Sequence, residues 1–269
     1  MARLTRNPAA LIGITCALLI VGCTPDQTTT PAELAEDVDA NDRAVEAALS
    51  RHDRPAADSE DDAARKPGSV LSFIGIEPGM TIFEMEAGGG YYTELFSRLV
   101  GPDGQVIMQN PSAFDSFLGD AVDKRLADDR LANVRLSKSR FDDLDTDDSS
   151  VDIVTWILGP HDLYYTPADG SSLGNDEAAF AEIARILKPG GTLVVLDHRA
   201  AVGSPSTTGG TVHRIDAAIV QNLATSASLV FAGESDVLIN GNDNYNMNVF
   251  DASVRRKTDR FILKFRKPE

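Results

Sequence analysis

Short apolar runs alternate with longer amphipathic segments along the chain from residue 81 onward. The apolar runs are strand-like and lie at 81–85, 105–109, 134–136, 151–157 and 192–197. The segments between them that predict helices are 91–100, 114–127 and 176–187. Because parallel strands need such crossovers, the alternation predicts a parallel sheet with helices on both faces.

The pattern changes beyond residue 197. A helical segment at 212–223 precedes two strand-like segments, at 229–231 and 260–265, which can pair antiparallel at the sheet edge. We therefore predict an α/β fold with a doubly wound, seven-stranded, mostly parallel sheet and an antiparallel edge strand.

The N-terminal segment has the pattern of an export signal. Two arginines, Arg3 and Arg6, precede an apolar run at 9–21 that is too short to span a bilayer comfortably. Its end, Leu-Ile-Val-Gly-Cys at 19–23, resembles a bacterial lipobox, which predicts lipidation of Cys23 after removal of residues 1–22. The alternative is an uncleaved membrane helix with an incidental cysteine. We expect a periplasm-facing lipoprotein of the bacterial cell envelope, sorted to the outer membrane.

A single domain is predicted to follow a tether. Residues 23–40 are rich in threonine, proline and acids, which predicts a flexible segment, and the domain then covers 41–269. Within it, 41–50 predicts a short helix, 51–67 is polar and interrupted by prolines, and 70–74 predicts a helix that closes on the sheet.

The charge of the chain limits its partners. The formal net charge is -16 and the sequence pI is about 4.6, so nucleic acid is not an expected partner, since phosphate binding relies on clustered Lys and Arg. An anionic membrane surface would also repel the domain, which leaves the lipid anchor as the expected membrane contact. The only cysteines are Cys16 and Cys23, so a processed chain has no disulfide.

Three consecutive glycines, Gly88, Gly89 and Gly90, follow the first predicted strand. In doubly wound sheets a ligand binds at the carboxyl ends of the strands, and glycines let the backbone turn sharply and approach it. The next helix offers free amide groups and a positive dipole end to a carboxylate or phosphate. Glu84 can accept hydrogen bonds from a ligand ammonium, or only order the loop. An ordinary tight loop is the alternative interpretation.

Several motifs resemble those of one enzyme family. Residues 83–93 read FEMEAGGGYYT, which resembles the first motif of class I S-adenosylmethionine-dependent methyltransferases, particularly a bacterial group of predicted methyltransferases with the pattern E-x-x-P-G-G-G-x-Y-T. Residues 187–193, LKPGGTL, look like the turn before the fifth strand of these enzymes. Further segments at 197–200, 212–216, 234–236 and 257–261 extend the resemblance to about 58–268.

The resemblance implies a Rossmann-like fold and methyl transfer from S-adenosylmethionine, with a small molecule as the expected acceptor. It implies that the cofactor lies across residues 84–90, with its ribose near the end of the second strand and its adenine near 141–142. The cofactor-binding residues that we expect are Glu84, Glu86, Gly88, Gly89, Gly90, Asn110, Phe141, Asp142 and Gly159.

The chain departs from the family pattern at two places. Many class I enzymes hold the ribose hydroxyls with an acid at the end of the second strand, whereas this chain has Gln109 and Asn110 there. An amide can still hydrogen-bond, but less strongly than a carboxylate. Glu86 replaces the first glycine of the usual D/E-x-G-x-G-x-G pattern, and its side chain can crowd the cofactor or hydrogen-bond to it.

Histidines that follow predicted strands are the candidate bases. His161 follows the fourth strand, where an imidazole could take a proton from the acceptor, and Asp162 could orient it. A capped turn is the alternative. His198 follows the fifth strand and is a second candidate, although an ion pair within 197–199 is the more conservative interpretation.

Other polar residues are given structural roles. His213 and Arg214 are expected to open a helix, where a surface or capping role is favoured over binding of an anionic substrate group. Asp259 and Arg260 are expected to form an internal pair or a register lock at the last strand. The acidic run 142–148 lacks the spacing of a calcium loop, so no metal site is predicted.

Two functions are compatible with these patterns. The first is a methyltransferase of a small-molecule acceptor, anchored in the cell envelope. The second is a non-catalytic envelope lipoprotein that uses the same turn to bind another adenosine-like or anionic ligand, since a fold does not fix a function. The export signal favours the second, because S-adenosylmethionine is made in the cytoplasm.

Overall fold

The structure is a computed structural model that describes residue 1, residues 31–167 and residues 170–269, with the side chains of the first helix described from residue 40. The predicted export signal and Cys23 lie outside the described residues, apart from Met1. Among the described helices, none combines the length and the apolar character that crossing a membrane requires.

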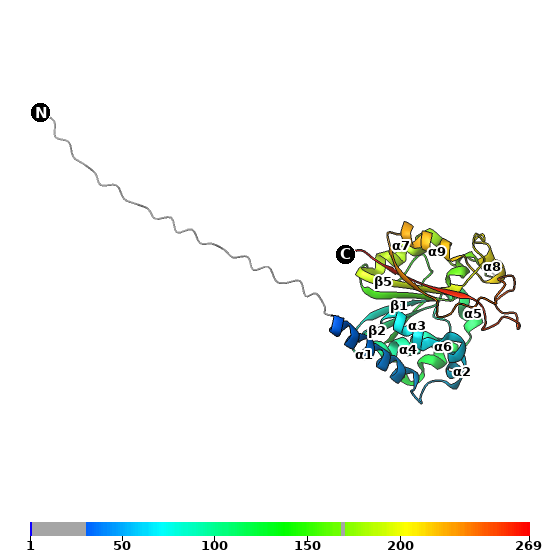
Figure 1. Ribbon diagram of the computed structural model, residues 1–269, viewed down its shortest axis with the longest axis horizontal. Helices are drawn as coiled ribbons and strands as arrows, with labels where there is room; N and C mark the ends of the chain where they lie inside the picture. Colours follow the sequence, from blue (N-terminus) through cyan, green and yellow to red (C-terminus); the bar gives the residue numbers. More distant parts are fainter. Residues whose placement is uncertain (2–30, 168–169) are drawn as a thin grey trace.

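A seven-stranded sheet forms the centre of the domain, in the order β3-β2-β1-β4-β5-β7-β6 (Figure 1). Only β7 breaks the parallel arrangement, because it pairs antiparallel with both β5 and β6. The predicted fold class and antiparallel edge are confirmed. The strands are β1 Thr81–Met85, β2 Gln105–Gln109, β3 Val134–Ser137, β4 Val151–Ile157, β5 Leu187–His198, β6 Val230–Ser235 and β7 Arg260–Arg266.

Helices cover both faces of this sheet (Figure 1). Helices α4 and α7 match predicted segments, because their hydrophobic periodicity is strong. The α-helices are α1 Pro31–Leu49, α2 Ala56–Arg65, α3 Pro67–Ile74, α4 Tyr91–Val100, α5 Asp115–Leu118, α6 Ala121–Leu126, α7 Asp176–Ile186, α8 Thr208–Val212 and α9 Ala217–Ser226. Short 3-10 helices are η1 Ser112–Phe114, η2 Ala127–Asp129 and η3 Pro160–Tyr164.

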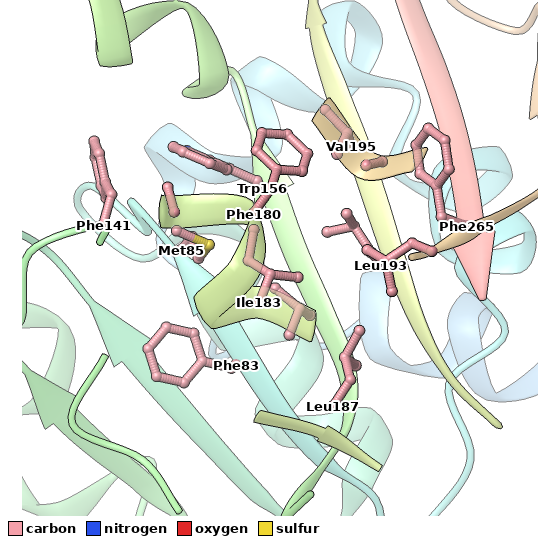
Figure 2. Close-up of a cluster of buried hydrophobic side chains, with 14 of the residues drawn as sticks. Phe83, Met85, Phe141, Trp156, Phe180, Ile183, Leu187, Leu193, Val195 and Phe265 are labelled. Carbon is pink, nitrogen blue, oxygen red and sulfur yellow. The ribbon is translucent and has the colours of Figure 1, made fainter. Parts of the chain in front are cut away.

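Two hydrophobic clusters, one on each face, hold the layers together. Neighbouring strand residues alternate between them, as Ile153 and Val154 do in β4, because successive side chains of a strand point to opposite faces. One cluster packs against α1, α3 and α4. The other contains Trp156 and Phe180, and packs against α7 and α9 (Figure 2). The sheet is thus buried on both faces. A functional site can therefore form only outside these faces, such as at the carboxyl ends of the parallel strands.

Four helical predictions need correction. Helix α1 begins at Pro31, so residues 31–40 are helical rather than part of a flexible tether. Helix α2 lies in the polar segment 51–67, for which no helix was predicted. The predicted helix at 114–127 is divided, because Gly119 adopts a φ of 55° between α5 and α6. The helix predicted at 212–223 begins at Ala217.

His213 explains the last of these differences. Its φ of 55° ends α8 at Val212, and α9 starts only where the Asp216 side chain accepts a hydrogen bond from the Ala218 amide. The expectation that His213 and Arg214 open a helix is therefore wrong, since both lie in the connection between two helices.

Candidate active site

The glycine loop after β1 turns through left-handed backbone conformations. Gly88 and Gly90 have φ values of 58° and 83°, and Glu86 has a φ of 52°. The loop is fixed by the end of β2, since the Gln109 side-chain oxygen accepts from the Glu86 amide at 2.8 Å. Asn110 accepts from the Gly88 amide at 2.8 Å and donates to the Gly88 carbonyl at 3.1 Å. In the structure Asn110 therefore orders the loop, where the sequence expectation placed it against the cofactor.

A cavity of about 360 Å³ opens beside this loop, at the carboxyl end of β1. Helix α2, which the sequence did not predict, forms its opposite wall. Arg125 ties the two walls together, because it donates to the Gly89 carbonyl at 2.9 Å and to Asp58 of α2 at 2.7 and 2.9 Å. The acidic residues that line the cavity are Asp58, Glu60, Asp61, Glu84 and Glu86, against the basic residues Arg65, Arg125 and Arg256.

Glu84 is buried at the base of the cavity. Its side chain is only 2% exposed and accepts a hydrogen bond from the Thr93 hydroxyl. Burial raises the pKa of Glu84 to about 8, although the Thr93 hydrogen bond and the charge of Arg125 act in the opposite direction. At neutral pH most Glu84 side chains are therefore protonated in the folded protein.

This pKa predicts a pH dependence of stability. The pKa of Glu84 is raised from 4.5 to about 8, so between these pH values the folded chain holds a proton that the unfolded chain has lost. Stability should fall across this window by on the order of 1 kcal/mol per pH unit, and level off above it. The change Glu84→Gln should remove this slope, which urea unfolding at pH 5, 6, 7 and 8 measures. Parallel curves for the two proteins would contradict the assignment.

His161 lies in η3, directly after β4, and is 3% exposed. Asp197, at the end of β5, accepts from the His161 backbone amide at 2.9 Å and lies 2.8 Å from its Nδ1. Burial lowers the pKa of His161, but the charge and the hydrogen bond of Asp197 outweigh it and raise the pKa overall. The sequence expectation named Asp162 as the orienting group, whereas in the structure Asp197 makes the hydrogen bond to the ring.

Asp162 instead lies between two imidazoles. Its Oδ1 is 3.4 Å from Nε2 of His161 and 3.4 Å from Nδ1 of His213. Burial raises the pKa of Asp162, but His213 and His161 outweigh it and the net shift is downward. A surface or capping role was the favoured expectation for His213. The structure therefore adds a third polar side chain to the predicted pair.

A pair of glycines brings His213 to this position. A Cβ on Gly209 would lie closer than 3.0 Å to the His161 carbonyl oxygen, and a Cβ on Gly210 would lie equally close to the Tyr164 carbonyl oxygen. Helix α8 can therefore pack against η3 only because both residues lack a side chain. The Gly-Gly pair at 209–210 was the signal in the sequence that two backbones approach closely here.

His161, Asp162 and His213 form a group that we call the histidine cluster. His198 lies near this cluster but makes different contacts. Its Nδ1 lies 2.7 Å from the Thr258 hydroxyl, and its ring centre is 6.0 Å from that of His161. Burial lowers the pKa of His198 well below its usual value, and the charge of His161 lowers it further, so this ring is neutral.

The expected pairing of neighbouring charges is also different. Arg199 pairs with Asp259 at 3.2 Å, rather than with Asp197. The predicted pair of Asp259 with Arg260 does not form as a salt bridge, because Arg260 donates to the Ala64 carbonyl at 2.6 Å.

Glu86 connects the glycine loop to the histidine cluster. Its carboxyl group accepts from the Trp156 indole at 3.0 Å and is hydrogen-bonded to Asp162. Burial raises the pKa of Glu86 well above its usual value, and the charge of Asp162 adds to the shift, so Glu86 is the protonated partner of the two. A Cβ on Gly159 would clash with both Glu86 and Trp156, so the hydrogen bond between these two residues requires a glycine at this position.

Phe141 and Asp142 do not line the cavity. Phe141 is fully buried in the core, with its ring centre 4.9 Å from that of Trp156 (Figure 2). Asp142 pairs with Arg140 at 3.0 Å and accepts from the Asn175 amide at 2.8 Å. Their contact with the adenine stays a prediction.

Comparison with known proteins identifies the same region. The model of a methyltransferase domain matches residues 84–195. The chain is 32% identical over 128 residues to the ubiquinone/menaquinone biosynthesis C-methyltransferase UbiE of Shewanella pealeana, a match that covers 48% of this chain and 46% of that protein. It thus spans about half the length of the curated relatives it matches.

Solved structures share the fold at low identity. A SAM-dependent methyltransferase from Aquifex aeolicus has a TM-score of 0.54 at 17% identity, over 79% of this chain and 98% of its own. The geranyl diphosphate C-methyltransferase of Streptomyces coelicolor has a TM-score of 0.55 at 16% identity, over 82% of this chain and 87% of its own.

Residues 84–195 are thus similar to a methyltransferase domain, and the chain has the fold of the solved methyltransferases. The methyl donor of this class is S-adenosylmethionine, which bears a sulfonium and an ammonium group. The cavity offers such a ligand its glycine backbone and the carboxyl groups of Glu60 and Asp61 of α2. Its volume of about 360 Å³ also lies in the range of small-molecule sites.

Proposed function

We propose that the protein transfers the methyl group of S-adenosylmethionine to a small-molecule acceptor. One observation carries this proposal: the cavity beside the glycine loop is linked, through Glu86 and Asp162, to a buried histidine that Asp197 orients. The donor cavity and the candidate base are therefore connected through neighbouring side chains.

The chain's own residues would act mainly by positioning. Bound S-adenosylmethionine supplies an electrophilic methyl group on a sulfonium, which an acceptor displaces in line. The glycine loop lets the backbone approach the donor, and α2 covers it from the opposite side. The uncharged Glu86 and the ionised Asp162 give the region between the two sites a polar surface.

His161 is the group that we assign to the acceptor proton. The hydrogen bond from Nδ1 to Asp197 leaves the lone pair on Nε2, which is the atom that can accept a proton. Asp162 would stabilise the imidazolium, since its Oδ1 lies 3.4 Å from Nε2. His198 is a poorer base, because its pKa is strongly lowered.

Gly89→Ala tests the donor site. A Cβ at this residue would make only an ordinary 3.6 Å contact with Ala121, so the fold should tolerate it, but the methyl group would reduce the space for the donor. We expect S-adenosylmethionine to bind about 10- to 100-fold more weakly, as calorimetry would measure. Gly241→Ala is the matched control, since nothing lies within 4 Å of a Cβ there.

Activity is tested with S-adenosylmethionine labelled in its methyl group and a panel of small phenols, hydroquinones and amines. Hydroquinones are included because the matched relatives are ubiquinone/menaquinone biosynthesis C-methyltransferases. Label in an acceptor, together with release of S-adenosylhomocysteine, supports the proposal. Failure of the wild-type protein to bind S-adenosylmethionine at millimolar concentration would rule it out.

We also propose that the protein is a lipoprotein of the cell envelope, anchored through Cys23. This proposal rests on the lipobox-like segment at 19–23 and on the basic, then apolar, segment before it. Fatty-acid labelling of the expressed chain should be lost in Cys23→Ala, and the protein should leave the membrane fraction. Membrane attachment that survives this change would refute the anchor.

A further inference from the structure

Three side chains of metal-binding types converge at the histidine cluster. His161 and Asp162 come from η3, and His213 comes from the connection between α8 and α9. One ligand atom from each, two imidazole nitrogens and a carboxylate oxygen, lie within 4.8 Å of one another. The carboxylate oxygen is 3.4 Å from each nitrogen.

Two of these three atoms lack a hydrogen-bond partner. Oδ1 of Asp162 and Nδ1 of His213 are both buried, and neither makes a hydrogen bond with the described residues. The 3.4 Å separation between them is longer than an N–H···O hydrogen bond. A buried carboxylate oxygen without a donor is unfavourable, and a bound cation would satisfy it.

The hydrogen bond to Asp197 sets the correct tautomer of His161. Nδ1 of this ring donates to Asp197 at 2.8 Å, so Nε2 turns its lone pair toward Asp162. A lone pair that faces a carboxylate oxygen is repulsive unless a proton or a metal ion lies between them. A carboxylate that accepts from the second nitrogen of a histidine is also the usual support of a metal-binding histidine.

The separations match those of a small transition-metal ion. Zinc binds histidine nitrogen and carboxylate oxygen at about 2.0–2.2 Å, so a tetrahedral ion holds its ligand atoms about 3.3–3.5 Å apart. Two ligand pairs here are 3.4 Å apart. We propose that His161, Asp162 and His213 bind one divalent transition-metal ion of the zinc type, with a fourth position open to water or to an acceptor oxygen.

The surrounding residues hold these ligands in place. His213 keeps a left-handed backbone with a φ of 55°, and its ring packs against Phe250 and Tyr165, with ring centres 4.9 and 5.6 Å away. Glu86 is hydrogen-bonded to Asp162. The ligand set is thus formed before any ion binds, which reduces the cost of binding.

A metal ion and a proton cannot occupy Nε2 of His161 together. With the ion bound, the open fourth position rather than Nε2 would contact the acceptor, and this role rests on the proposed methyl transfer. Metal binding itself does not, because it is measured without S-adenosylmethionine.

The test uses the full chain, stripped with a chelator and titrated with Zn²⁺ by calorimetry and with Co²⁺ by visible absorption. We expect one ion per chain and the spectrum of a four-coordinate cobalt ion. His213→Asn should weaken binding at least about 100-fold, since it removes one of three ligands. Asparagine is chosen because it tolerates the left-handed backbone. Asp162→Asn is the second variant.

The matched control is His52→Asn, because His52 is exposed and lies before α2, outside the cluster. Its affinity for Zn²⁺ should equal that of the wild type. The proposal is overturned if the wild type binds neither ion at millimolar concentration. It is also overturned if both ligand variants, shown to be folded by circular dichroism, bind as tightly as the wild type.

Discussion

Replacement of Arg214 by alanine is expected to lower the free energy of unfolding by about 3–5 kcal/mol. The Arg214 side chain is 0% exposed and pairs with Asp243 at 2.8 Å. It also donates to the Met247 carbonyl at 2.9 Å and to the Arg199 carbonyl at 3.1 Å. Without the guanidinium, Asp243 would be left as a buried charge without its cation, and two carbonyl groups would lose their donor.

Chemical denaturation of the variant and the wild type measures this effect. Arg255→Ala is the matched control, since Arg255 is exposed and its loss should change stability by no more than about 0.5 kcal/mol. Equal effects of the two substitutions would show that the buried ion pair is not specifically important. The comparison also reports on the site, because Arg214 directly follows His213 and anchors its segment to the 243–247 loop.

The second large effect is expected for Gly209→Ala, which should slow methyl transfer about 100-fold. The added Cβ would overlap the His161 carbonyl oxygen, so α8 must move away from η3 and carry His213 with it. A displacement of about 1 Å at reacting groups can cost two orders of magnitude in rate. Overpacking should also cost about 1–3 kcal/mol of stability.

Two measurements separate displacement of the site from misfolding. The donor cavity is lined by other residues, so the affinity for S-adenosylmethionine should stay within about twofold of the wild type. Gly241→Ala, which adds the same methyl group in open space, should leave rate and stability unchanged. An unchanged rate of methyl transfer in Gly209→Ala would separate the histidine cluster from catalysis.

The sequence predicted the sheet well because burial on both faces leaves a strong local signal. β1, β2 and β4 are short apolar runs and have the bounds that the sequence indicates. Helix α4 was equally clear, since it follows the glycines directly and its apolar residues repeat with helical spacing, although all of its residues except Arg98 are buried. The glycine loop was also predicted, because residues other than glycine rarely adopt the left-handed backbone conformation that such a turn needs.

Helices without such a signal were missed or misplaced. Helix α2 reads AADSEDDAAR and has no apolar stripe, because it is held by charged contacts such as those of Arg54 with Asp62 and of Arg125 with Asp58. Arg125 lies 67 residues from Asp58 in the sequence, so no local pattern predicts that contact. The division of the 114–127 helix depended on the backbone of a single glycine, Gly119.

Residue type and position after a strand were enough to select His161 and His198 from the sequence. They could not assign hydrogen-bond partners to these histidines, because contacts between residues at the ends of neighbouring strands depend on how the strands are ordered in the sheet. β4 and β5 lie side by side, which places Asp197 against His161, and the glycines of α8 bring His213 over both. The sequence by itself thus determined the fold class, the position of the glycine loop and the choice of His161 and His198 as candidate bases. Only the tertiary structure decided which carboxylate orients which ring and which side chains form a cluster, because these contacts join residues far apart in the chain.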